Sequence, residues 1–509
     1  MAARKSVVLV TVDCLRADHC GFMGYRCPTT PFLDTMATES FVFPNAMVAG
    51  APTYYSFPAI MASRHPLALG REVLGLAVGE ENLALAFKNN GYATAFFGAA
   101  NPYLSPQFGY DFGFDTFCDF LDGDLAPASN SDHDSTNGSH WAGNLNRALA
   151  SVSHKIPGLG AAYDELYFQY CQRWAAPVTQ SLDVLRRFPA ADVIVDRAKA
   201  WLSAVGEKPF FLWLHFMDPH SPYYPMEEAL ELFGERRLTA ARARYLNEFW
   251  NRFDVGSGRL QRYREDIIAL YDAGVYWVDA QLSKLTEALL RLKLWENCIF
   301  AFTADHGEEF LEHAGRYHAP SLTEELIHVP LLLRVPGTVK RMVSKNPFSL
   351  IHLAPTLLEA AGTPIPGEFQ GHSHWKQVAA GAAWGEPAIA ECVAGCTNPF
   401  RGEQRRGSRL LAIREARYKL VLNFDTHAEN FFDLQADPLE RSPLPDGAVQ
   451  PERRRLLETA LAHLKGSNHP RNSESYLRTR LREIALHSSR VTPEASTRAA
   501  WHADTSRVG

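Results

Sequence analysis

The chain of 509 residues contains no run of 18 apolar residues, so we expect no membrane-spanning helix. An excess of positive charge is also missing, because 51 Lys and Arg stand against 57 Asp and Glu, a net charge of −6. Nucleic-acid-binding proteins show clustered basic residues, and we therefore expect no nucleic-acid partner. Internal repeats are absent as well. The hydrophobic fraction of 46% is that of an ordinary globular protein.

Cysteine pairs of the kind that bind zinc are also missing. Cys392 and Cys396 are spaced like neighbours on a helix, but no second pair completes a site. We interpret the eight scattered cysteines as reduced and mostly buried, which predicts a cytoplasmic protein. The basic start at residues 1–5 is followed by only a short apolar run, which we interpret as a strand and not a signal peptide.

Two apolar strands end in residues that can bind a metal. Residues 6–12 are aliphatic or β-branched and lead directly into Asp13. Residues 298–303 form a second such run, and Asp305 and His306 follow it. Chemistry in open α/β sheets is found at the carboxyl ends of the strands, so we expect the three side chains to meet at one sheet edge.

The rest of the first 375 residues alternates between helix and strand patterns. Such a βαβ rhythm predicts a large, mostly parallel sheet flanked by helices, as one catalytic domain over residues 1–375. A polar stretch at about 122–142 interrupts it and is typical of a surface insertion. The predicted elements are helices beginning at 31 and over 83–90, 190–204, 263–293 and 351–361, and strands over 92–97, 210–217 and 331–336.

Beyond residue 375 the pattern changes to short strands separated by turns. Residues 410–413, 418–422 and 431–434 predict a small antiparallel sheet, and 452–465 a helix that packs on it. We therefore expect a C-terminal subdomain over 376–465. Residues 466–509 are polar, with little to bury, and predict a loosely ordered tail.

Asp13, Asp305 and His306 offer oxygen and nitrogen ligands for Zn²⁺, Mn²⁺, Mg²⁺ or Ca²⁺. The alternative is that Asp305 merely caps a helix beginning at the following Gly-Glu-Glu. Cys14 is either a thiolate ligand or a buried structural thiol. Thr53 precedes an apolar helix, where a metal-bound hydroxyl could serve as nucleophile. Equally, Thr53 or Ser56 could be a simple N-cap.

Two histidines in predicted loops could act on a substrate. His220 follows the strand that ends at 217, and His318 lies twelve residues after His306. Either could donate to a substrate oxygen or protonate a leaving group, or be no more than a solvated loop residue. Arg16 and Asp18 are expected to form an ion pair that holds the loop after Asp13.

Taken together, these pieces resemble the sulfatase family of the alkaline phosphatase superfamily. The resemblance covers about residues 5–445, with several motifs in the family's order. The motifs are Val12-Asp-Cys-Leu-Arg-Ala-Asp-His19, Phe216-Met-Asp-Pro-His-Ser-Pro-Tyr223, Thr303-Ala-Asp-His-Gly-Glu-Glu-Phe310, Leu322-Thr-Glu-Glu-Leu-Ile-His-Val-Pro330, Tyr418-Lys-Leu420 and Phe432-Asp-Leu434.

The chain departs from the family at the nucleophile. Sulfatases that use formylglycine carry Cys or Ser there, with Pro and Arg at the second and fourth positions after it. Here the stretch is Thr53-Tyr-Tyr-Ser-Phe57, so formylglycine is not expected. The threonine is similar to that of phosphoethanolamine transferases and nucleotide pyrophosphatases. The lysine that arylsulfatases carry after the next strand is also missing, and Asn101 is expected to supply a neutral substrate donor.

The resemblance implies a metal-dependent hydrolase or transferase with a small-molecule or glycan ester as its substrate. One divalent metal is expected on Asp13, Asp305, His306 and Thr53, with Cys14 as a further candidate. The spacing of Asp218 and His220 does not fit the Asp-x-x-x-His of two-metal relatives. His220 and His318 would contact the substrate, and Thr53 would attack it.

An aldehyde hydrate can release sulfate by breaking its own C–O bond, but a threonine ester cannot. Its release requires attack at sulfur or phosphorus, and phosphoryl groups tolerate such attack. The threonine therefore favours phosphate or phosphonate substrates over sulfate. The alternatives are a sulfatase without formylglycine and a non-catalytic relative that binds anions. The oligomeric state stays open.

Overall fold

The structure is a computed structural model that describes residues 4–71, 73–121, 165–166, 168–170, 181–233, 237–338, 345–465, 477–478 and 480–484. The predicted insertion at 122–142 and nearly all of the predicted tail at 466–509 lie outside the described residues. The boundaries predicted for the domains stay predictions.

A seven-stranded sheet forms the centre of the fold, in the order β2-β11-β7-β1-β6-β4-β5. The predicted large, mostly parallel sheet is confirmed; β11 is the antiparallel exception, pairing with both β7 and β2. The strands are β1 (Ser6–Val12), β2 (Phe41–Val42), β4 (Ala93–Gly98), β5 (Thr116–Cys118), β6 (Phe210–Phe216), β7 (Cys298–Ala304) and β11 (Leu331–Arg334).

The central strand β1 runs parallel to both of its neighbours. All seven of its residues are buried, as the apolar pattern predicts for a strand covered on both faces. Val12 pairs with Phe216 of β6 and with Ala304 of β7, so the three strands end level with one another. This register brings the residues after each strand to one edge of the sheet.

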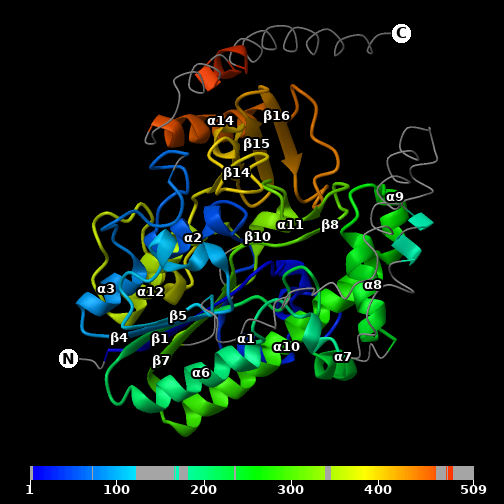
Figure 1. The fold of residues 1–509 in the computed structure, drawn as a ribbon. Coiled ribbons are helices and arrows are strands. Elements are labelled where there is room, and N and C mark those ends of the chain that lie inside the picture. The colour runs from blue at the N-terminus through cyan, green and yellow to red at the C-terminus, as the bar shows by residue number, and fades with distance from the viewer. Residues whose placement is uncertain are drawn as a thin grey trace, which may run out of the picture.

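Helices cover both faces of the sheet (Figure 1). On one side α6 and the long α10 run together, and on the other lie α2, α3 and α12. No helix among the described residues is both long and apolar enough to cross a bilayer. The α-helices of this part are α1 (Pro31–Ala37), α2 (Thr53–Ala62), α3 (Leu83–Asn89), α6 (Ala191–Ala204), α7 (Glu227–Phe233), α8 (Ala240–Trp250), α9 (Ser257–Leu260), α10 (Arg264–Arg291), α11 (Glu324–Ile327), α12 (Leu353–Ala361) and α13 (Trp375–Ala380).

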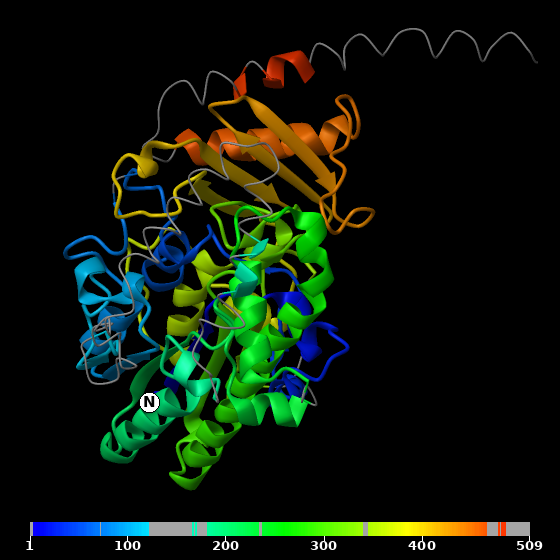
Figure 2. The ribbon, with the colours of Figure 1, turned by 45° about the vertical axis from the view of Figure 1, so that its right-hand side comes forward.

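The C-terminal sheet is antiparallel, in the order β13-β14-β15-β16, and α14 packs against it (Figure 2). Its strands are β13 (Ala388–Val393), β14 (Arg409–Arg414), β15 (Tyr418–Asn423) and β16 (Ala428–Asp433), and α14 spans Gln450–Lys465. The sequence pattern misses β13, because its alanines and Glu391 have low β propensity. The helical spacing read for Cys392 and Cys396 is wrong, since Cys392 belongs to this strand.

Two smaller sheets complete the fold. The first has the order β10-β3-β12, and the second pairs β8 with β9. Their strands are β3 (Ala46–Met47), β8 (Glu309–Phe310), β9 (Arg316–Tyr317), β10 (His328–Val329) and β12 (Phe348–Ser349).

Candidate active site

Asp13, Asp305 and His306 meet at the carboxyl edge of the central strands. Each offers one ligand atom, and these atoms all lie within 4.8 Å of one another. All three side chains are buried, with at most 1% of each residue exposed. The level ends of β1 and β7 produce this cluster, although the residues are nearly 300 positions apart.

The cluster is built to accept a cation. His306 Nδ1 lies 2.8 Å from the carbonyl oxygen of Gly307 and donates to it, so the lone pair of Nε2 faces the carboxylates. From Nε2 the distance is 3.6 Å both to Asp13 Oδ1 and to Asp305 Oδ2. Asp305 Oδ2 is buried without a hydrogen-bond partner. Because such an oxygen is costly to bury, its position favours a bound divalent metal.

The pKa values of these three side chains also favour a bound cation. Burial opposes charge on Asp13, but the hydrogen bond with His215 and the nearby imidazoles hold its pKa well below the usual range. Burial and the charge of Asp13 raise the pKa of Asp305 well above its usual range. Burial and His318 lower the pKa of His306 to about 3, which keeps its imidazole neutral. Two carboxylates this close repel each other, and a cation between them would allow both to be ionised.

Thr53 lies beside these residues. It is the first residue of α2, and its Oγ1 is 3.2 Å from His306 Nε2. The N-cap interpretation is wrong, because Pro52 occupies that position and no side chain caps the helix. Ser56 lies inside the helix, with its hydroxyl buried and without a partner. Thr53 therefore places a hydroxyl at a helix N-terminus, where backbone N–H groups favour an anion.

Asn101 and His215 hold Asp13 from the other side. Asn101 Nδ2 donates to Asp13 Oδ2 at 2.8 Å, so part of its donor capacity goes to the carboxylate. The predicted contact of Asn101 with substrate stays a prediction. His215 Nε2 lies 3.5 Å from the same oxygen, and its Nδ1 is 3.0 Å from Thr11 Oγ1. Sequence reasoning missed His215; the available signal was one imidazole inside an apolar strand.

His220 and His318 both lie near the cluster. Their predicted contact with a substrate stays a prediction. Their ring centroids are 5.0 Å apart, and that of His318 is 4.7 Å from that of His306. His318 Nδ1 lies 3.2 Å from Glu308 Oε1. Burial opposes charge on His318, but Glu308 raises its pKa, whereas burial lowers the pKa of His220. His318 is therefore protonated more easily than His220, although the two imidazoles are neighbours.

Cys14 is buried next to Asp13. Its Sγ donates to Asp13 Oδ1 at 2.9 Å and lies 3.3 Å from His318 Nδ1. Burial, together with Glu308 and the carboxylates, raises the pKa of this thiol well above its usual value. Its role as a metal ligand stays a prediction.

The segment after His306 differs from the helix that the alternative interpretation required. Glu309 and Phe310 form strand β8, so Asp305 caps no helix at this point. The predicted ion pair is present: Arg16 binds Asp18 at 2.8 Å, and its NH1 also binds Glu312 at 2.7 Å. Arg16 therefore ties the loop after Asp13 to the loop after His306.

The cluster opens into a hollow of about 510 Å³, which Asn101, His220 and His318 also line. Its walls carry several aromatic rings and one arginine that the sequence analysis did not identify, namely Tyr54, Tyr103, Phe188, Phe253, Tyr317 and Arg316. Aromatic walls suit a planar ring or the apolar face of a sugar.

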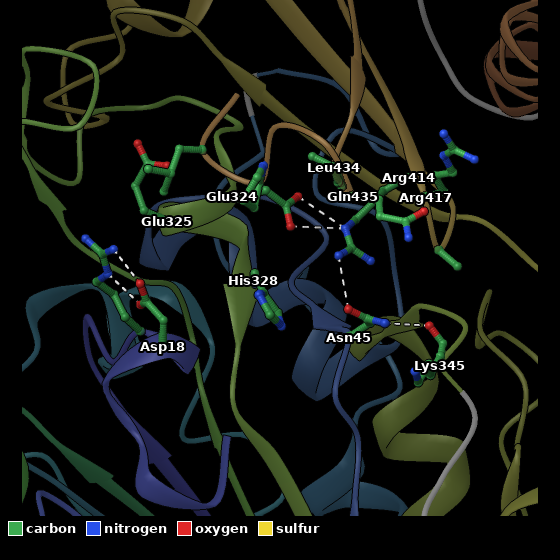
Figure 3. Close-up of a pocket in the computed structure, with 14 residues that line it drawn as sticks. Asp18, Asn45, Glu324, Glu325, His328, Lys345, Arg414, Arg417, Leu434 and Gln435 are labelled. Atoms are coloured by element: carbon green, nitrogen blue, oxygen red, sulfur yellow. Dashed lines mark hydrogen bonds and ion pairs between the residues drawn. The ribbon is translucent and has the colours of Figure 1, made fainter. Parts of the chain in front are cut away.

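A second hollow, of about 630 Å³, lies where the C-terminal sheet meets the larger part of the molecule (Figure 3). Several of its polar groups bind one another: Arg414 contacts Glu324 at 3.1 Å and Asn45 Oδ1 at 3.1 Å (Figure 3). Arg16 pairs with Asp18 in the same hollow. The pair of Arg414 with Glu324 joins β14 to α11.

Together, the fold and the cluster define an α/β protein with side chains that could hold a divalent metal, a hydroxyl and two histidines at one sheet edge. Residues 5–363 match the sulfatase family, and residues 312–466 match the family of N-sulphoglucosamine sulphohydrolase C-terminal regions. The chain therefore belongs to the sulfatase family.

Relatives and solved structures agree with this assignment. Arylsulfatase K of Xenopus laevis is 26% identical over 340 residues, which cover 61% of this chain and 62% of that protein. The phosphonate monoester hydrolase of Agrobacterium radiobacter has a TM-score of 0.61 at 18% identity, covering 91% and 95%. The protein BT4656, solved with its substrate D-glucosamine-2-N,6-O-disulfate, has a TM-score of 0.63 at 17% identity, covering 93% and 100%.

The comparisons point to a hydrolase acting on ester bonds. Members of the family typically bind a divalent metal, and the Asp13, Asp305 and His306 group fits one. The two structural likenesses show the fold alone.

Proposed function

We propose that this protein hydrolyses phosphate, phosphonate or sulfate esters through Thr53, with phosphoryl substrates preferred. The observation that carries the proposal is the position of Thr53 Oγ1, 3.2 Å from His306 Nε2 and inside the pocket. A metal held by Asp13, Asp305, His306 and Thr53 would supply positive charge that lowers the pKa of the threonine hydroxyl and of bound oxygens. The identity of that metal stays open.

The side chains divide the remaining work. The N-terminus of α2, at Thr53, would stabilise the negative charge that develops on the transferred group. His318, which contacts Glu308, would protonate the leaving oxygen, with His220 as its neighbour. Asn101 and His215 fix Asp13, and the aromatic walls offer an apolar surface to the leaving group.

The preference for phosphoryl groups follows from the chemistry of the adduct. A threonine ester of sulfate or phosphate is released only by attack at sulfur or phosphorus, because threonine has no aldehyde hydrate to expel the group. Phosphoryl adducts tolerate such attack when their charge is neutralised.

The second candidate is a sulfatase that works without formylglycine, which the arylsulfatase relatives favour. A glycan sulfate is then the natural substrate class, as for BT4656. A non-catalytic relative that binds anions is the third reading, and the complete Asp13, Asp305 and His306 cluster speaks against it. We also propose a cytoplasmic location, which the free cysteines among the described residues support and cell fractionation tests.

A panel of aryl phosphate, phosphonate, phosphodiester and sulfate esters tests the proposal. The wild type should turn over a phosphorus ester fastest, and Thr53→Ala should remove that activity while metal content stays the same. Faster turnover of sulfate esters would replace the first candidate by the second. Activity that survives Thr53→Ala unchanged would remove the threonine from the mechanism.

A further inference from the structure

Four side chains that could bind a metal gather far from Thr53 in the sequence. His352 ends a 3-10 turn before α12, His372 and His374 flank Ser373 before α13, and Glu386 lies two residues before β13. Their ligand atoms all lie within 4.8 Å of one another. His372 Nε2 is 3.2 Å from Glu386 Oε2, close to the roughly 3.3 Å between donors in a tetrahedral zinc site.

His374 is the residue that points to a ligand. It is 1% exposed, and neither of its ring nitrogens has a hydrogen-bond partner. Its ring centroid is 4.7 Å from that of His372 and 5.0 Å from that of Trp384. A buried imidazole without a hydrogen-bond partner is costly unless something binds it.

His352 has a different position in the cluster. Its Nδ1 accepts the backbone N–H of His372 at 3.2 Å, so the proton of the neutral ring is on Nε2. That Nε2 lies 3.9 Å from Glu386 Oε2, a small side-chain adjustment away from a hydrogen bond. Imidazole and carboxylate partners of this kind orient the ligands of metal sites.

The backbone around the histidines is fixed before any ligand arrives. The N–H of His374 donates to Thr356 Oγ1 of α12 at 3.1 Å, and that of Gly371 donates to Ser63 Oγ at 3.0 Å. Ser63 is the C-cap of α2, the helix that begins with Thr53. Ligands held this rigidly lose little conformational freedom when they bind a metal.

We propose that His372, His374 and Glu386 bind one divalent transition-metal ion of the Zn²⁺ type, with His352 orienting the carboxylate. Two imidazoles and one carboxylate leave a fourth position for water, which the exposure of His372 and Glu386 permits. Such ligands select Zn²⁺ or Co²⁺ over Mg²⁺ and Ca²⁺. The ion cross-links the loop before α13 to the start of β13, and so joins the large domain to the C-terminal sheet.

Titration with Co²⁺ tests this site separately from the cluster at Thr53. Tag-free protein is stripped with a chelator and titrated in excess Mg²⁺, so that the oxygen-rich cluster is filled. We expect visible Co²⁺ absorption that one equivalent of Zn²⁺ displaces, and a melting temperature that rises with Zn²⁺. His372→Ala and Glu386→Gln change exposed side chains, so both variants should fold. Each should weaken Zn²⁺ binding at least about 100-fold, and His352→Ala about 10- to 100-fold.

Two controls decide where the signal comes from. His427→Ala changes a surface histidine in the turn between β15 and β16 and should leave the titration unchanged. Asp305→Asn disables the cluster at Thr53 and should also leave the signal in place. The proposal is overturned if no Co²⁺ signal appears, or if the signal survives His372→Ala and disappears with Asp305→Asn. The contact of His372 with Glu386 would then be an ion pair only.

Discussion

Thr53 Oγ1 lies 3.2 Å from His306 Nε2, although 253 positions separate the two residues. The helix α2 brings the hydroxyl, and the end of β7 brings the imidazole. Since His306 Nδ1 donates to a carbonyl, the nitrogen that faces Thr53 has a lone pair and not a proton. Under the proposed function, a metal held at this cluster would use both the threonine oxygen and the imidazole, and the proposed chemistry depends on that arrangement.

Replacing Thr53 separates the nucleophile from the metal site. We expect Thr53→Ala to lower kcat by at least about 10³-fold on the best substrate, because no other hydroxyl takes its place. Thr53→Ser should keep part of the activity, since the oxygen remains. Steady-state kinetics together with metal analysis measure both effects. A variant that loses activity only in parallel with its metal would show that Thr53 acts as a ligand alone.

Asn101 is expected to act through Asp13. Without its 2.8 Å hydrogen bond the carboxylate is less well oriented, and Asn101→Ala should weaken metal affinity about 10- to 100-fold. Calorimetric titration of chelator-treated protein measures this affinity. The matched control is Asn297→Ala, because Asn297 donates to the Arg4 carbonyl at the opposite edge of the sheet. Equal affinities in both variants and the wild type would contradict the assignment.

His318 should matter most when the leaving group is poor. As a general acid it contributes about 10²- to 10⁴-fold, so His318→Gln should reduce turnover of an alkyl ester by about that factor. An ester of 4-nitrophenol, which leaves as a stable anion, should lose much less. Turnover rates of wild type and His318→Gln on the two esters show whether His318 acts as a general acid. The same loss on both esters would mean that His318 only positions the substrate.

Much of the fold could be predicted from local pattern, and the site could be predicted in part. The apolar runs ending at Asp13 and Asp305 indicate buried strands, and the level register of β1 and β7 follows from a parallel sheet. The sequence pattern could not show β13, which is held by pairing with β14 and by the ion pair between Glu391 and Arg409. These are tertiary contacts, which the β propensity of the individual residues does not include.

The support around the site was harder to predict for the same reason. His215 lies in an apolar strand, where the pattern suggests a buried structural residue. Only the fold shows that it lies beside Asp13. His372 and Glu386 lie in different segments, and their spacing in the sequence matches no metal-binding motif. Only the fold shows that their side chains meet. Resemblance to a family identified the motif residues, whereas side chains outside the motifs required coordinates.

The ion pair between His313 and Glu325 predicts a pH dependence of stability. The two side chains are 2.6 Å apart, and the hydrogen bond to Glu325 raises the pKa of His313 to about 9. Because that pKa lies above the unfolded value of about 6.5, the stabilisation is complete below pH 6.5 and is lost as the pH rises through 9. At pH 6.5, His313→Gln should lower the free energy of unfolding by about 1–3 kcal/mol.

Denaturant unfolding of the wild type and His313→Gln between pH 6 and pH 10 measures this effect. The difference between the two proteins should be largest at the acidic end and should shrink towards the alkaline end. His427→Gln serves as the control for loss of a surface histidine. A difference that stays constant over the whole range would show that His313 contributes by packing and not by charge.

Anomalous diffraction from crystals grown with Mn²⁺ would locate the metal. We expect one strong peak within bonding distance of Asp13, Asp305, His306 and Thr53 Oγ1. A peak that leaves the threonine oxygen out of the coordination shell would contradict this expectation, as would an empty cluster in crystals that hold the ion elsewhere.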